Sequence, residues 1–200
     1  MMTTVRSPGP STTAILVVDV QNDFCPGGAL PVPHGDRVVP VLNRVIREAE
    51  HLGLPVYASR DWHPADSTHF RVAGGHWPVH CVAGSRGAEF VGQLQLPSAT
   101  HILDKGVDQN ADGYSALEGR LHDGTLFEEH LHTGGIDRLV VGGLATDYCV
   151  RHSVLDARGR GLRVTVLTDA VAAVDLKPGD GNLALEEMRA ASTTEKGDVG

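Results

Sequence analysis

The feature that most constrains the fold is a nearly continuous apolar run at 14–20, rich in β-branched residues. A strand buried on both faces has this pattern, as in a parallel sheet covered by helices on both sides. Further apolar runs, typical of strands, occur at 55–60, 101–106, 137–141 and 162–167. They alternate with patterns typical of helices at 36–52, 125–132, 146–158 and 180–191. This alternation predicts a three-layer α/β/α fold with a mostly parallel central sheet of five to six strands.

Length and composition limit the class of protein. The 200 residues suit one domain, which we expect over 14–191, with a flexible lead-in at 1–13 and a polar tail at 192–200. A net charge of −8 without a basic cluster argues against a nucleic-acid partner, and no apolar run is long enough for a membrane span. The lead-in lacks the apolar segment of a signal peptide, and three widely spaced cysteines do not make a disulfide framework. The expected location is the cytoplasm.

Cys149 is the candidate nucleophile. It follows the strand at 137–141 and a glycine turn, in the first turn of the helix predicted at 146–158. The positive end of the helix macrodipole and the free N–H groups there favour thiolate over thiol, and the N–H groups can hold an oxyanion. The alternative is a small buried residue that fills space between helix and sheet.

Charged residues recur at the ends of other predicted strands. Asp19 ends the first apolar run, and Lys105 ends the strand at 101–106. Ligands of such sheets bind beyond the carboxyl ends of the strands, where Asp19 could take the thiol proton and Lys105 could stabilise both anions. The alternatives are an aspartate that caps the following loop and a solvated lysine. No Gly-x-Gly-x-x-Gly follows the first strand, which disfavours a dinucleotide site.

A second group of residues suits a metal ion. Asp61 and His63, two residues apart at a strand end, point to the same side, and His80 follows a glycine-rich loop. Two imidazoles and one carboxylate suit zinc, iron or manganese with open coordination positions. His69 is either a fourth ligand or an exposed side chain, and Cys81 is an alternative soft ligand. Because the chain has 11 histidines, a solvated histidine-rich loop is the alternative to a metal site.

Four motifs carry a family resemblance, and they occur in the family's order. They are Asp19-Val20-Gln21-Asn22-Asp23-Phe24 with Gly27-Gly28-Ala29-Leu30, Ser59-Arg60-Asp61-Trp62-His63-Pro64, Trp77-Pro78-Val79-His80-Cys81, and Gly143-Leu144-Ala145-Thr146-Asp147-Tyr148-Cys149-Val150. Lys105-Gly106 falls between the third and the fourth. From about residue 14 to 190, the chain resembles the nicotinamidases, or pyrazinamidases, of the isochorismatase-like cysteine hydrolases.

The resemblance implies an isochorismatase-like (Rossmann-like) fold and an amidohydrolase that converts nicotinamide to nicotinate and ammonia in NAD salvage. From this resemblance, Cys149 is expected to attack the amide carbon and form a thioester. Asp19 is expected to take the thiol proton and pass it to the leaving ammonia, and Lys105 to support both residues. The backbone N–H groups of Ala145 and Cys149 form the oxyanion hole, and the Leu144–Ala145 peptide is expected to be cis. Pyrazinamide is a second substrate that the resemblance implies.

The resemblance also implies a cofactor and binding residues. Asp61, His63 and His80 hold one divalent metal ion, with zinc preferred over iron or manganese, which binds the pyridine nitrogen and supplies the water that hydrolyses the thioester. Phe24 and Trp77 flank the ring, and Tyr114 lies near the pocket. A small-molecule substrate and a homo-oligomer are the expected partners. Family members have an apolar edge strand after the last helix, and the polar segment 190–196 predicts that it is missing or rudimentary.

Other functions stay open. A related cysteine hydrolase, with or without metal, could act on another small amide or on an isochorismate-like ether; intact metal ligands speak against the ether. A non-catalytic member of the fold is disfavoured because all three catalytic residues are present. A metal-dependent hydrolase with a bystander cysteine predicts that Cys149→Ala keeps most activity.

Overall fold

The computed structural model describes residues 12–191. The predicted tail at 192–200 and most of the predicted lead-in lie outside the described residues, as do residues 192–196 of the polar segment 190–196, where the edge strand is expected to be missing. Within the described range, Thr12 and Thr13 already belong to the first strand. No helix in this range combines the length and the apolar character that a membrane crossing requires.

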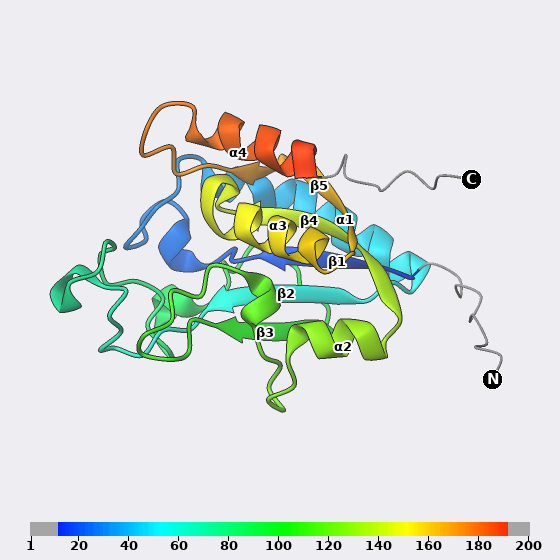
Figure 1. The fold of residues 1–200 in the computed structure, drawn as a ribbon, viewed down its shortest axis with the longest axis horizontal. Helices are drawn as coiled ribbons and strands as arrows, with labels where there is room; N and C mark the ends of the chain where they lie inside the picture. The colour runs from blue at the N-terminus through cyan, green and yellow to red at the C-terminus, as the bar shows by residue number, and fades with distance from the viewer. Residues whose placement is uncertain (1–11, 192–200) are drawn as a thin grey trace, which may run out of the picture.

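The centre of the fold is a sheet of five strands within residues 12–191, in the order β3-β2-β1-β4-β5. Every neighbouring pair is parallel, which confirms the predicted sheet. The strands are β1 (Thr12–Val18), β2 (Val56–Asp61), β3 (His101–Lys105), β4 (Ile136–Leu144) and β5 (Arg163–Ala172) (Figure 1).

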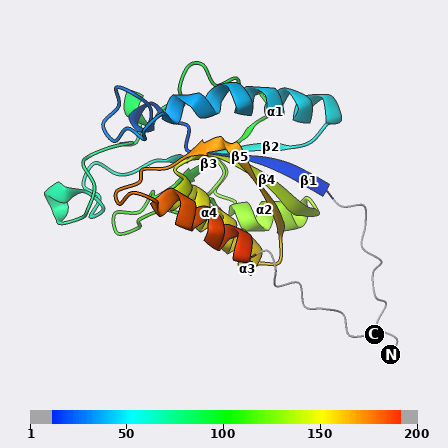
Figure 2. The same cartoon turned by 90° about the horizontal axis from the view of Figure 1, so that it is seen from above.

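Four helices cover the two faces of the sheet. Helix α1 (Val38–Leu52) lies on one face, and α2 (Phe127–Thr133), α3 (Arg151–Gly159) and α4 (Asp180–Ala190) lie on the other (Figure 2). One side of α1 is buried against the sheet, and it consists of Val38, Val39, Leu42, Ile46 and Ala49. The helix ends at Gly53, whose φ of 67° is the left-handed conformation that favours glycine. The three layers predicted from the sequence are therefore confirmed.

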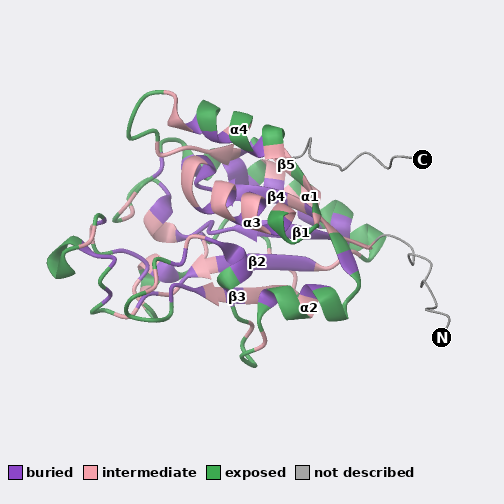
Figure 3. Cartoon of the chain, in the orientation of Figure 1, coloured by how far each residue is buried: buried purple, intermediate pink, exposed green. Residues whose placement is uncertain are grey.

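The central strand of the sheet, β1, is buried on both faces. In β1, Ile15 and Val17 pack into the core on the α1 side, whereas Ala14, Leu16 and Val18 pack into the core under the other helices. Figure 3 shows the same distribution, with buried residues concentrated along the central strands. Burial on both faces is the physical reason that the first strand has no alternation of polar and apolar residues.

The strand order positions the site. The sheet is built outward from its centre in two directions: β2 and β3 follow β1 on one side, and β4 and β5 follow on the other. The direction changes between β1 and β4. Ligands of doubly wound sheets bind at such a switch point, beyond the carboxyl ends of the strands. Asp19 directly follows β1 and Cys149 lies just past β4, so both flank this point. The long connection at 62–100 extends beyond the same edge of the sheet (Figure 1).

Candidate active site

Strand β4 delivers Cys149 to the site through a backbone path that requires glycine. Gly143 has a φ of 130°, and a Cβ atom there would overlap the backbone of Val18 in the neighbouring strand. The Leu144–Ala145 peptide that follows is cis, as the resemblance implies. The predicted continuous helix at 146–158 is only partly correct, because Thr146–Val150 forms a π-helical turn before α3 begins.

Three side chains that are far apart in the sequence meet at the switch point. The Lys105 Nζ atom lies 2.8 Å from Asp19 Oδ2 and 3.5 Å from Cys149 Sγ. All three residues are buried, and Lys105 is only 1% exposed. Lys105 also contacts the Asp61 carboxylate and donates a hydrogen bond of 2.7 Å to the Gly113 carbonyl oxygen. The lysine is therefore not solvated, which was the alternative from the sequence.

The charge on Lys105 is stable in this position. Burial acts to lower the pKa of Lys105, but the carboxylates of Asp19 and Asp61 outweigh it and raise this pKa well above its ordinary value. The pKa of Asp61 is held well below its usual range, because Lys105 and His63 favour the carboxylate more strongly than burial disfavours it. A permanent cation therefore lies between two acidic groups and beside the cysteine.

The surroundings of Cys149 favour the thiol over the thiolate, which opposes the effect expected of the helix terminus. Burial raises the pKa of Cys149 well above its ordinary value; Lys105 opposes this, and the negative charges of Asp19 and Asp61 add to it. Burial also raises the pKa of Asp19, which makes this carboxylate a better proton acceptor. A thiol with a raised pKa needs a neighbouring base to remove its proton, and the Asp19 carboxylate lies within 4.8 Å of the sulfur.

Ser59 is a member of the site that sequence reasoning missed. Its hydroxyl group donates a hydrogen bond of 2.7 Å to Asp19 Oδ1, and both residues are fully buried. Ser59 pairs with Val18 in the register of β1 and β2, which places it beside Asp19. The other carboxylate oxygen, Oδ2, forms an ion pair with the Lys105 ammonium group at 2.8 Å. The carboxylate of Asp19 is thus held by Ser59 on one oxygen and by Lys105 on the other.

Three buried histidines form the second part of the site. His63, His69 and His80 each offer a ring nitrogen within 4.8 Å of the others. Asp61 Oδ2 lies 3.6 Å from His63 Nε2 and 3.9 Å from His80 Nε2. The predicted group of Asp61, His63 and His80 is thus brought together, and His69 joins it from a buried position instead of being exposed.

Hydrogen bonds set the orientation of all three imidazole rings. Each Nδ1 atom faces an acceptor: Gly106 O at 3.0 Å from His63, Asp112 Oδ1 at 2.9 Å from His69, and Pro78 O at 2.7 Å from His80. Because a carbonyl oxygen only accepts, Nδ1 of His63 and of His80 carries a hydrogen, and in the neutral form of each ring Nε2 is the atom that can bind a metal. Such outer partners are typical of histidines that bind metals.

The donor set fits a divalent metal ion. His63 Nε2 is buried without a hydrogen-bond partner, which costs free energy unless something binds it. Burial lowers the pKa of His80 to about 4 and also lowers the pKa of His69, which favours the neutral rings that metal binding requires. The Cys81 thiol instead approaches the Gly87 carbonyl oxygen, and burial raises its pKa. Cys81 therefore does not take the place of His80.

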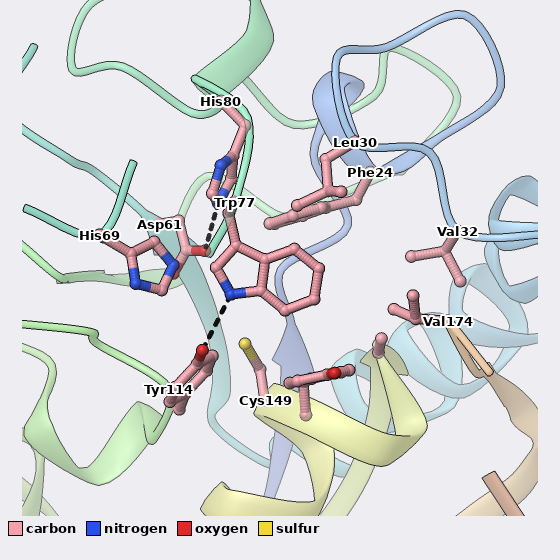
Figure 4. Close-up of a pocket in the computed structure, with 12 residues that line it drawn as sticks. Phe24, Leu30, Val32, Asp61, His69, Trp77, His80, Tyr114, Cys149 and Val174 are labelled. Carbon is pink, nitrogen blue, oxygen red and sulfur yellow. Dashed lines mark hydrogen bonds and ion pairs between the residues drawn. The ribbon is translucent and has the colours of Figure 1, made fainter. Parts of the chain in front are cut away.

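An aromatic slot connects the cysteine to the histidines (Figure 4). The Trp77 indole N–H donates a hydrogen bond of 2.9 Å to the Tyr114 hydroxyl oxygen. The ring centroids of Phe24 and His80 lie 5.5 Å apart. The three predicted substrate residues thus line one pocket together with Cys149. Its remaining lining residues are Leu30, Val32, Asp61, His69, His80, Ala145, Tyr148 and Val174. A narrow slot with a nucleophile and polar ligands suits a flat ring that carries a carbonyl group.

The pocket includes residues that the sequence analysis did not select. Tyr148 packs edge-on against Trp77, with ring centroids 5.0 Å apart. Val174 follows β5, and the Asp147 carboxylate accepts hydrogen bonds from the backbone N–H groups of Val174 and Asp175 at 2.9 and 2.8 Å. Only its position beside Cys149 could have indicated Tyr148, and nothing local indicated Val174.

The fold and the site define an α/β protein with a buried cysteine, aspartate and lysine beside a histidine cluster. A model of the isochorismatase domain matches residues 13–196. The nicotinamidase of Escherichia coli K12 is 41% identical over 198 residues, which cover 90% of this chain and 92% of that protein. The chain belongs to the isochorismatase family.

Solved structures agree with this placement. The pyrazinamidase of Pyrococcus horikoshii, in complex with zinc, has a TM-score of 0.82 and 43% sequence identity, covering 90% of this chain and 95% of that chain. PnC1 of L. infantum, in complex with nicotinate, has a TM-score of 0.79 and 34% identity, covering 91% of this chain and 90% of that chain. These similarities extend over nearly the whole chain.

Proposed function

We propose that this protein is a nicotinamidase, an amidohydrolase that converts nicotinamide to nicotinate and ammonia and thereby acts in NAD salvage. The observation that carries the proposal is the meeting of Cys149, Asp19 and Lys105 at one end of an aromatic slot that also reaches the histidine cluster. Similarity to nicotinamidases and pyrazinamidases over most of the chain supports the same reaction.

The first half of the proposed reaction forms a thioester. Asp19 accepts the thiol proton while Cys149 Sγ attacks the carboxamide carbon, and Lys105 stabilises the two negative charges. The backbone N–H groups of Ala145 and Cys149 are the proposed donors to the tetrahedral oxyanion. Asp19 then returns its proton to the amide nitrogen, the C–N bond breaks, and ammonia leaves.

The second half hydrolyses the thioester. Asp19, again a carboxylate, takes a proton from a water molecule that attacks the thioester carbon. The C–S bond breaks, the sulfur takes the proton from Asp19, and the nicotinic acid formed loses its remaining proton to solvent and leaves as nicotinate. The buried, protonated Lys105 holds Asp19 in place during both proton transfers.

We propose Asp61, His63 and His80 as ligands of one divalent metal ion, with His69 as a further ligand. Zinc is the preferred ion, because imidazole and carboxylate ligands suit it and the similar Pyrococcus horikoshii structure contains it; iron and manganese are the alternatives. When bound, the ion would act as a Lewis acid towards the pyridine nitrogen and would thereby orient the ring.

Removal of the metal is expected to lower the rate of ammonia release from nicotinamide by at least about 10-fold, because loss of ring orientation removes part of the proximity effect. Zinc added back restores the rate. The measurement is ammonia release before and after dialysis against a chelator, with metal content determined by elemental analysis and folding by circular dichroism. Full activity in protein shown to be metal-free would contradict the proposal.

A panel of amides tests the substrate. Ammonia release is measured from nicotinamide, pyrazinamide and benzamide, which has the same shape but no ring nitrogen. The proposal predicts a kcat/KM for benzamide about 100-fold below that for nicotinamide, because benzamide has no ring nitrogen to bind the proposed metal ion. A faster reaction with benzamide or another small amide would make the protein a related cysteine hydrolase instead.

We further propose a cytoplasmic homo-oligomer with a single catalytic domain over 14–191. The three cysteines are free and buried, and the proposed chemistry needs Cys149 reduced, which suits a reducing compartment. Size-exclusion chromatography with light scattering tests the oligomer, and a mass equal to one chain would contradict it.

A further inference from the structure

We propose that Asp23 is a positioning residue that fixes the proposed metal ligand His80 relative to the Phe24 wall of the slot; this inference rests on the proposed function. Asp23 lies in the short 3₁₀ helix Asn22–Phe24 that follows β1, and it does not line the pocket itself. Its two carboxylate oxygens accept hydrogen bonds from two different loops. Oδ2 accepts the backbone N–H of Cys81 at 2.7 Å, and Oδ1 accepts that of Ala29 at 3.1 Å.

The bond to Cys81 acts on the loop that carries His80. Cys81 directly follows His80 and has a φ of 44°, a left-handed conformation that is unfavourable for a residue with a side chain. On its other side the same loop pairs with His63, whose N–H donates to the Cys81 carbonyl oxygen at 3.0 Å and whose carbonyl oxygen accepts the N–H of Ala83 at 2.8 Å. The backbone next to His80 is therefore fixed between a second proposed ligand and Asp23.

The bond to Ala29 acts on the loop that forms the apolar wall. The Asp23 carbonyl oxygen also accepts the N–H of Leu30 at 2.9 Å, and both Phe24 and Leu30 line the slot. The Phe24 and His80 rings lie 5.5 Å apart. Asp23 thus joins the loop that positions a ring-binding wall to the loop that positions a ligand of the proposed metal.

The short helix Arg86–Ala88 leaves room for the Asp23 carboxylate at Gly87. A Cβ atom on Gly87 would overlap the Asp23 carboxyl group, so only glycine permits this approach. The φ of Gly87 is not in the left-handed region, so the backbone would tolerate alanine, and the three atoms nearest to its Cβ would all belong to the Asp23 carboxyl group. Gly87→Ala therefore displaces the Asp23 side chain without removing any hydrogen-bonding group.

Asparagine cannot replace Asp23 without loss, although its shape is the same. Each carboxylate oxygen accepts a different backbone N–H, whereas a side-chain amide has one oxygen and one NH₂ group. In Asp23→Asn, either Cys81 or Ala29 therefore faces an N–H donor instead of an acceptor. The bond to Cys81 is partly buried and the bond to Ala29 is exposed, so an unsatisfied donor costs more at Cys81, and the loss of either bond frees the loop that it holds.

The test measures zinc affinity of the substrate-free protein by competition with a chromophoric chelator. Asp23→Asn and Gly87→Ala are expected to bind zinc roughly 10–100-fold more weakly, the usual effect of removing a partner outside the ligand shell. Both variants should also raise KM for nicotinamide by a larger factor than they lower kcat. The matched controls are Asn22→Ala, which removes a 2.8 Å side-chain bond from the same short helix to the Arg86 carbonyl oxygen, and Gly92→Ala, which has open space around it.

The controls should bind zinc within about twofold of the wild type, since the Asn22 side chain bonds to Arg86 instead of Cys81 and a Cβ atom at Gly92 has nothing within 4 Å. Unchanged zinc affinity in folded Asp23→Asn and Gly87→Ala would overturn the proposal, as would an equal loss in Asn22→Ala. Melting curves by circular dichroism separate a loss of affinity from a loss of folding. The zinc titration contains no nicotinamide, so a wild type that binds zinc but does not release ammonia would overturn the proposed function and leave the role of Asp23 standing.

Discussion

Cys149→Ala is expected to lower kcat for nicotinamide hydrolysis by at least about 10⁴-fold, because removal of the nucleophile removes the covalent route. Cys149 is the only cysteine that lines the slot among the described residues, and its sulfur lies 3.5 Å from Lys105 Nζ. Ammonia release by purified wild type and variant, at equal metal content, is the measurement.

Cys25→Ala is the matched control for this variant. Cys25 is buried like Cys149, but it packs in the core on the α1 side, and burial raises the pKa of its thiol to about 11. Its removal should leave kcat within a few-fold of the wild-type value. If Cys149→Ala kept most of the wild-type activity, the protein would be a metal-dependent hydrolase with a bystander cysteine.

Lys105→Met is expected to impair both stability and activity. Methionine has a similar length, but it leaves Asp19 and Asp61 buried without their shared cation. Breaking a buried ion pair by removing one partner costs about 3–5 kcal/mol of unfolding free energy. Loss of the Lys105 charge should also lower kcat by roughly 100-fold or more, because no cation then stabilises the negative charge on Asp19 or on the Cys149 sulfur during the reaction. Urea unfolding followed by circular dichroism measures the first effect and ammonia release the second.

Arg160→Met is the control for this stability effect. Arg160 pairs with Glu128 at 2.8 Å, but the two side chains are 36% and 55% exposed. An exposed ion pair contributes about 0–1 kcal/mol, so the variant should unfold close to the wild type and keep its activity. A Lys105→Met variant that unfolds like Arg160→Met and remains active would show that the buried network has no role in the reaction.

The sheet could be predicted because its central strand, β1, is buried on both faces and is therefore apolar along most of its length. Its strand limits could not. Strand β4 continues to Leu144, although the pair Gly142–Gly143 is typical of a turn, because both glycines pair with β1 at Val17 and Val18. The close approach of two backbones explains these glycines, and that approach is a property of the sheet rather than of the local sequence.

The candidate site was predicted in part, for a related reason. Asp19, Lys105 and Cys149 could be selected because the carboxyl ends of parallel strands meet at one edge. His69 could not be separated from an exposed histidine, because its burial depends on how the long connection at 62–100 folds over the site. Ser59 carries no chemical signal of its own, and it matters only because strand register places it beside Asp19.

The central claim is that the carboxamide passes through a thioester on Cys149. The most direct measurement is rapid acid quenching of the wild type with nicotinamide during turnover, followed by mass spectrometry of its peptides. The account predicts a nicotinoyl group on the peptide that contains Cys149 and none on that peptide in Cys149→Ala. Turnover at the full rate with no modified peptide at any time point, together with an active Cys149→Ala variant, would contradict it.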